Sequence, residues 1–165
     1  MEKSAKLGKL TLLNIILFGF IGQVAWAVEN NFFNTFLFSF GGTTKDISTM
    51  VAASAVVAVV TTFVMGTLSD KLGRRKVFIC AGYVAWGITV MAFAFISREN
   101  LGKLIGADPS SAAALSATVT TVIVMDCIMT FMGSTSNDSA FNAWITDVTV
   151  PSNRAKTEGL LAILP

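Results

Sequence analysis

The sequence contains no histidine and few charged residues, and each absence excludes classes of function. Without an imidazole, the chain has no histidine metal site, no histidine general base and no histidine proton relay. It also lacks a G-x-S-x-G motif, a P-loop and a cluster of metal-ligating residues. We therefore expect that the protein is not an enzyme, holds no cofactor or metal and binds no nucleic acid.

The shortage of charge points to a membrane protein. Charged residues make up 13% of the chain, whereas soluble domains carry about 25%. Three charge-free runs, 10–28, 47–69 and 77–97, each approach the roughly 20 residues that a helix needs to cross a bilayer. A fourth run, 111–146, is interrupted only by Asp126 and Asp138.

These runs predict an all-α membrane protein embedded in the lipid bilayer. We expect complete helices at about 10–40, 47–69, 77–97 and 111–146. A further apolar run from Gly159 to Pro165 predicts the truncated start of a fifth helix over 157–165. The segment 98–110 is rich in residues typical of turns and is expected to be irregular.

A basic cluster separates the second and third runs. Residues 66–76 read Gly-Thr-Leu-Ser-Asp-Lys-Leu-Gly-Arg-Arg-Lys. Four cations and one acid are too costly to bury in hydrocarbon, so this segment must turn at the membrane surface. The positive-inside rule places that turn in the cytoplasm.

The other basic residues agree with this orientation and put the N-terminus in the cytoplasm. The cytoplasmic side then carries nine cations: Lys3, Lys6, Lys9, Lys71, Arg74, Arg75, Lys76, Arg154 and Lys156. The outer side carries Lys45, Arg98 and Lys103. We expect the protein in the plasma membrane of the cell.

The N-terminus allows one alternative. A basic start, an apolar stretch and the triplet Ala25-Trp26-Ala27 are typical of a cleaved signal peptide. Against cleavage, apolar character resumes at Phe32 and three more spans follow. Cleavage would leave the loop at 66–76 in the cytoplasm, so the mass of the mature N-terminus distinguishes the two cases.

The segment 66–76 closely resembles the loop between helices 2 and 3 of the major facilitator superfamily, a class of secondary transporters. The matching residues are Gly66, Asp70, Gly73, Arg74 and Arg75, and Lys71 fills a basic position. The resemblance implies a twelve-helix fold, of which this chain would be the N-terminal part, and a loop that latches the two halves together.

Asp70 ends a helix, where the dipole disfavours a carboxylate, so it needs Arg74 or another helix's N-terminus as a partner. We expect Gly66 to permit close helix approach and Gly73 to adopt a positive φ. The alternative is a basic loop that only sets the topology.

Acids at membrane depth are candidates for function. Asp138 is nine residues from Asp147, or about 13 Å along a helix, which places it near the middle of the membrane. Glu29 and Asp126 each lie about 30 Å from the inner surface and are expected near the wet outer rim. Asp138 therefore must face the interior of the helix bundle or a water-filled cavity.

Two rows of polar residues accompany these acids. Thr130, Ser134 and Asn142 share a broad helix face with Asp138, and interhelical hydrogen bonding would also explain them. On the first helix, Gln23, Asn30 and Asn34 point in a common direction with Trp26 nearby. Amides and an aromatic ring suit a neutral polyol such as a sugar, whereas the alternative is helix packing and an interfacial aromatic.

The segment from Asp138 to Arg154 also resembles the fourth helix and following loop of glycoside–pentoside–hexuronide:cation symporters. Asp138 and Phe141 match, and Ala140 replaces a proline. The resemblance implies that Asp138 binds cation and sugar. The family's paired acids on helix 2 have no counterpart in 47–69, which favours proton coupling or uniport over sodium coupling.

Together these patterns predict a secondary transporter of a small polar solute, coupled to a proton or a sodium ion. Its candidate binding residues are Asp138, Asn142, Gln23 and Trp26, and its partner would be the missing C-terminal half. A proton-coupled drug exporter and a non-transporting four-helix membrane scaffold are the alternatives.

The orientation can be tested by labelling with a membrane-impermeant thiol reagent after Cys80 and Cys127 are replaced by serine. Arg74→Cys should react only from the cytoplasmic side and Lys103→Cys only from outside, because the basic bias fixes the topology. The opposite pattern of labelling would show that the orientation is wrong.

Overall fold

The computed structural model describes residues 7–164, and every regular element among them is helical. Lys3, Lys6 and Pro165, which entered the expectations above, lie outside the described residues. The elements are α1 (Lys9–Ser39), α2 (Thr44–Leu72), α3 (Arg75–Ala92), η1 (Phe93–Phe95), α4 (Arg98–Ile105), α5 (Ala112–Gly133), the π-helix η2 (Ser134–Phe141), α6 (Asn142–Val148) and α7 (Pro151–Leu161).

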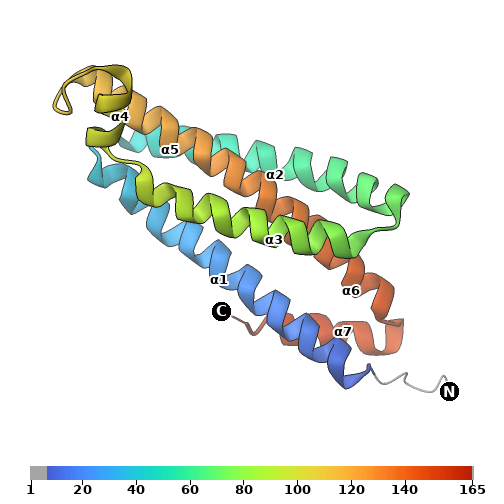
Figure 1. Ribbon diagram of the computed structural model, residues 1–165. Coiled ribbons are helices and arrows are strands. Elements are labelled where there is room, and N and C mark those ends of the chain that lie inside the picture. The colour runs from blue at the N-terminus through green and yellow to red at the C-terminus, as the bar shows by residue number, and fades with distance from the viewer. Residues whose placement is uncertain (1–6, 165) are drawn as a thin grey trace.

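Within residues 7–164, four helical segments are long and apolar enough to cross a membrane: Lys9–Ser39, Thr44–Leu72, Arg75–Phe95 and Ala112–Val148. The expected all-α membrane fold is confirmed. The long helices lie side by side and alternate in direction (Figure 1). The start of α1, the α2–α3 turn and the α6–α7 turn lie toward one end, and α4 lies at the other.

The turns between helices follow from local chemistry. Thr43 and Asp46 cap the start of α2 reciprocally, since each side chain bonds the backbone of the other. At the end of α2, Gly73 adopts φ 60°, as expected for the residue that closes a helix in the left-handed region.

Two expectations about helix boundaries are wrong. The segment 98–110 is not wholly irregular, because Ser97 caps α4 and Glu99 pairs with Lys103 one turn later. The last helix begins at Pro151 instead of residue 157, because proline suits the first helical position and Asn153 accepts a bond from the Val150 N–H.

The expected helix over 111–146 is present as one continuous segment, but its middle is a π-helix. The π segment η2 is polar and its side chains are mostly buried. π-Helical turns carry an extra residue and occur frequently at functional sites. This segment packs against both α2 and α3, so it lies at the centre of the described bundle.

Two apolar clusters flank the polar segment. One is built around Trp86, Phe33 and Phe93. The rings of Phe33 and Phe93 stack with their centroids 4.2 Å apart. The other is built around Ile15, Ile79 and Phe141. Met129, just before η2, belongs to the first cluster, and Ala140 and Phe141, the last two residues of η2, belong to the second. The buried polar groups of η2 therefore lie between two apolar layers.

Candidate functional site

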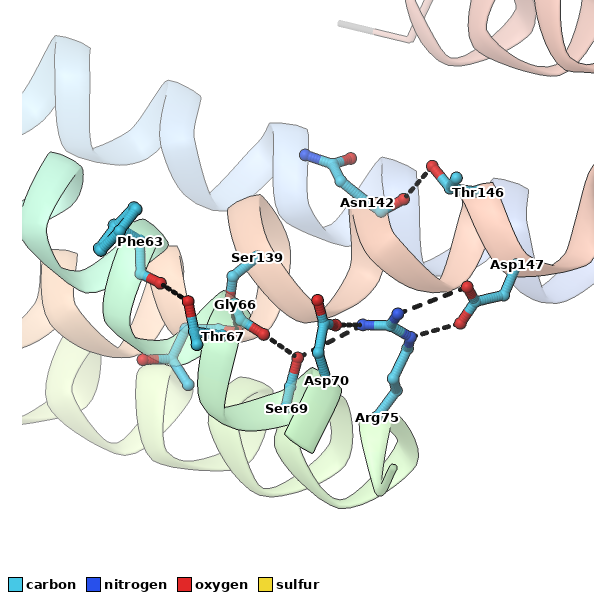
Figure 2. A network of polar contacts seen from close by, with 11 residues as sticks. Phe63, Gly66, Thr67, Ser69, Asp70, Arg75, Ser139, Asn142, Thr146 and Asp147 are labelled. Carbon is cyan, nitrogen blue, oxygen red and sulfur yellow. Dashed lines mark hydrogen bonds and ion pairs between the residues drawn. The ribbon is translucent and has the colours of Figure 1, made fainter. Parts of the chain in front are cut away.

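Arg75 joins the α2–α3 turn to α6. Its guanidinium lies 2.5 Å from the Asp70 carboxylate at the end of α2 and also bonds Asp147 on α6. A weaker contact reaches the Ser69 hydroxyl at 3.4 Å. Figure 2 shows the guanidinium between the two carboxylates. Arginine suits this bridge because its planar fork offers several donors at once.

This arrangement corrects the expected partner of Asp70. Arg74 or a helix N-terminus was expected in that role, but Arg75 fills it and Arg74 is exposed. The reason is local: Arg74 precedes the first turn of α3 with a non-helical backbone, whereas Arg75 begins the helix. Asp147, expected only as a marker of the inner surface, is also part of this site.

Gly66 faces Ser139 across the α2–η2 contact, as Figure 2 shows. A Cβ added at Gly66 would lie 3.7 Å from the Ser139 Cβ, which is ordinary van der Waals contact. The glycine is therefore not needed for close approach in this conformation, and that expectation is wrong here.

Asp138 lies within the central π segment, where both of its carboxylate oxygens accept hydrogen bonds. The Ser134 hydroxyl donates to Oδ2 at 2.9 Å and the Asn137 amide donates to Oδ1 at 3.1 Å. Asp138 is half-buried, and these two donors replace part of the hydration that its carboxylate has lost. Ser134 was expected on this face, whereas Asn137 was not, although it directly precedes Asp138.

Glu29 and Asp126 are not at a wet rim, contrary to expectation. Asp126 is only 2% exposed and is hydrogen-bonded to Ser54 of α2. Thr130 of α5 donates to Glu29 Oε1 at 3.1 Å, so it links α5 to α1. Distance along one helix does not predict this burial, because neighbouring helices cover both acids.

One carboxylate oxygen of Glu29 has no hydrogen-bond partner within residues 7–164. This oxygen, Oε2, is buried. The charges of Asp126 and Asp138 both act on Glu29, so the three acids share one electrostatic environment. Glu29 is thus an acid with one unpaired oxygen that is repelled by two other carboxylates.

The remaining candidates differ in how exposed they are. Gln23 and Asn142 are exposed, and the Asn142 amide donates to the Asp138 backbone carbonyl at 3.1 Å. Trp26 is half-buried instead, and its ring packs against Trp86 with centroids 5.1 Å apart. On the polar face expected for α1, Asn30, two turns from Gln23, is also exposed, whereas Asn34 is half-buried.

The comparisons with known proteins point to one family. The model described as the Major Facilitator Superfamily matches residues 12–164, which is nearly the whole chain. Comparison with curated proteins and with solved structures gave no match.

The Arg75 bridge can be tested by a double-mutant cycle on the free energy of unfolding in micelles. Arg75→Gln and Asp147→Asn should be coupled by up to about 1 kcal/mol, because Asp147 is half exposed and Arg75 only 20% exposed. The matched cycle with Arg74→Gln should give no coupling. Equal coupling in the two cycles would contradict the assignment of Arg75.

Proposed function

Since this chain belongs to the major facilitator superfamily, a class of secondary transporters, we propose that it is the N-terminal part of a carrier that moves a small polar solute. Transport proceeds by alternating access across the plasma membrane and is coupled to a proton or a sodium ion. The observation that carries the proposal is Asp138, a carboxylate at the centre of membrane-spanning helices with both oxygens hydrogen-bonded.

The buried acids support coupling to a cation. A protein that only spans the membrane gains nothing from carboxylates inside its bundle, since each is costly to desolvate. Asp126 is almost fully buried, and Glu29 has an oxygen without a partner in the described part of the chain. A bound proton or small cation would offset that cost, and its release would restore it. This argument favours a carrier over a four-helix scaffold.

The open polar face supports a partner half. Gln23 and Asn30 of α1 and Asn142 of α6 are exposed although their helices lie at membrane depth. Amides facing lipid would be unsatisfied, so these side chains favour contact with a solute, with water or with a C-terminal half of the same carrier. Substrate sites in such carriers lie between two halves.

Among solutes, we favour a neutral polyol such as a sugar, and sugar:cation symport as the mode. Amide groups on Gln23 and Asn142 can donate to and accept from hydroxyls without requiring a charged ligand. Trp26 contributes less directly, because its ring is engaged with Trp86 and can offer a solute only its uncovered edge. A proton-coupled drug exporter would use the same acids, but an apolar drug gains little from an amide-lined face.

The Arg75 bridge provides a second element of the proposal. It ties the end of α2 to α6, so it stabilises whichever access state brings those ends together. Gly66, Asp70, Gly73, Arg74 and Arg75 would then form the conformational latch that the family resemblance implies. Arg74 is exposed and available to the other half of the carrier.

The latch predicts a transport defect without a folding defect. In the complete carrier, Asp70→Asn should lower the rate of solute uptake by about fivefold, which corresponds to a contact worth about 1 kcal/mol. Membrane insertion should be unchanged because no apolar surface is lost. Uptake at the wild-type rate would reduce the loop to a topology signal.

The coupling role of Asp138 predicts a split between accumulation and exchange. Asp138→Asn in the complete carrier should abolish solute accumulation driven by an ion gradient, whereas exchange of solute across the membrane should persist. The reason is that an amide cannot take up and release the ion. The measurement is uptake of labelled solute into proteoliposomes with and without a gradient.

Asp108→Asn is the matched control, because Asp108 is exposed in the outer loop and its carboxylate accepts hydrogen bonds from Ser110 alone within residues 7–164. It should accumulate solute normally. Asp126→Asn does not serve as a control, because Asp126 is buried. Accumulation at the wild-type level in Asp138→Asn would show that the residue is structural.

A further inference from the structure

The chain's one tyrosine has two acceptors for a single proton. The Tyr83 hydroxyl of α3 lies 2.8 Å from Asn137 Oδ1 and 3.0 Å from the backbone carbonyl oxygen of Phe18 on α1. A phenol carries one O–H, so it can donate fully to only one of these oxygens at a time. The hydroxyl therefore has two hydrogen-bonding states, one for each acceptor, which are called the first and the second setting below.

In the first setting, Asp138 is ionised. Tyr83 donates to the Asn137 carbonyl oxygen, and the Asn137 amide donates to Asp138 Oδ1 at 3.1 Å. Ser134 donates to the other carboxylate oxygen. Every donor in this chain of bonds points toward the negative charge, and the Phe18 carbonyl receives no side-chain proton.

In the second setting, Asp138 has taken one proton from the aqueous phase. The new O–H of Asp138 needs an acceptor, and a half-turn of the Asn137 amide brings its carbonyl oxygen to that position. The amide nitrogen then faces the Tyr83 oxygen and donates to it, because the two ends of an amide are nearly the same in shape. Tyr83 must now turn its proton to Phe18. All polar groups keep a partner in both settings.

Helix α1 lies close to Tyr83 and Asn137. A Cβ added at Gly22 would lie 2.4 Å from Asn137 Oδ1 and 2.9 Å from the Tyr83 oxygen, so only glycine lets α1 approach this far. The Tyr83 ring also packs against Phe18 with centroids 5.5 Å apart. The backbone of α1 and the carboxylate of Asp138 are thus joined through two side chains.

The charged groups around Asp138 are few. Glu29 of α1 and Tyr83 of α3 interact with its charge, and Asp126 lies on its own helix. The charged residues of α2 lie at its two ends: Lys45, Asp46, Asp70 and Lys71. Asp147 of α6 is engaged by Arg75. Within residues 7–164, Asn137 and Ser134 are the side chains that donate to the Asp138 carboxylate.

We propose that Tyr83 and Asn137 are positioning residues that transmit the protonation state of Asp138 to the backbone of α1 at Phe18. This proposal rests on the proposed coupling role of Asp138. When Asp138 is neutral, Tyr83 ties α1 to α3 through the Phe18 carbonyl. When Asp138 is charged, that tie is released and α1 is free to move relative to α3. Proton binding would thereby bias a helix that carries candidate solute contacts.

The test uses a pair of labels that the sequence makes selective. Phenylalanine precedes glycine at only two places in the chain, Phe18–Gly19 and Phe40–Gly41. Labelling phenylalanine with carbonyl ¹³C and glycine with ¹⁵N therefore gives two carbonyl–amide correlations by solid-state NMR of the protein in lipid bilayers. The Phe40 signal is the internal control, since its carbonyl does not contact Tyr83.

In wild type, the Phe18 carbonyl shift should titrate with pH while the Phe40 shift stays constant, because only the former gains and loses the tyrosine bond. Asp138→Asn should remove the pH dependence of the Phe18 shift, since an amide does not titrate. Tyr83→Phe should remove the titration while preserving the ring and its packing.

A Phe18 shift that is independent of pH in wild type, or that still titrates in Tyr83→Phe, would overturn the proposal. The readout needs no transport, so it separates this proposal from the coupling role. If Phe18 titrates as described and Asp138→Asn still accumulates solute, the coupling role fails and the relay stands. If Asp138→Asn abolishes accumulation and Phe18 does not titrate, the relay is wrong.

Discussion

The structure depends on one constraint: a polar group buried at membrane depth must find its hydrogen-bond partner within the protein. The π segment η2 is rich in buried polar side chains, and the residues around it supply hydrogen-bond partners for them. Tyr83 reaches it from α3 and Gly22 lets α1 come close. The hydroxyls of Thr135, Ser136 and Ser139 donate to carbonyls one turn earlier. The two apolar clusters close over this polar layer from both sides.

Much of the fold could be predicted because the bilayer leaves few choices. Apolar runs of sufficient length must be helices, and a turn with four cations must lie at a surface. Local signals also worked where one residue decides the geometry, as at Gly73. The errors lie where two solutions have similar cost: a cap and one ion pair were enough to make α4 a helix within a segment rich in turn residues.

The candidate site was predicted less completely, for a different reason. Depth along a helix can be counted from the sequence, but the direction of a side chain depends on helices that pack against it. Asp138 was singled out by its depth and by a family resemblance, whereas Asp126 and Glu29 were placed at the rim although α2 and α5 supply their partners. Likewise, Arg74 and Arg75 are equivalent in sequence, and only the start of α3 decides which one meets the acids. Tyr83 was not among the expected site residues, although a lone phenol within an apolar run has a hydroxyl that needs a hydrogen-bond partner.

The π-helix also fixes the phase of everything that follows it. A π turn accommodates an extra residue, and one residue of an α-helix corresponds to a rotation of about 100°. If η2 were wound as an ordinary α-helix, the face presented by α6 would turn by about that angle relative to α5. Asp147 would then point away from Arg75, and the cytoplasmic bridge would be lost although no residue of it had changed. The irregular winding in the middle of the membrane thus sets the alignment of charges at its surface.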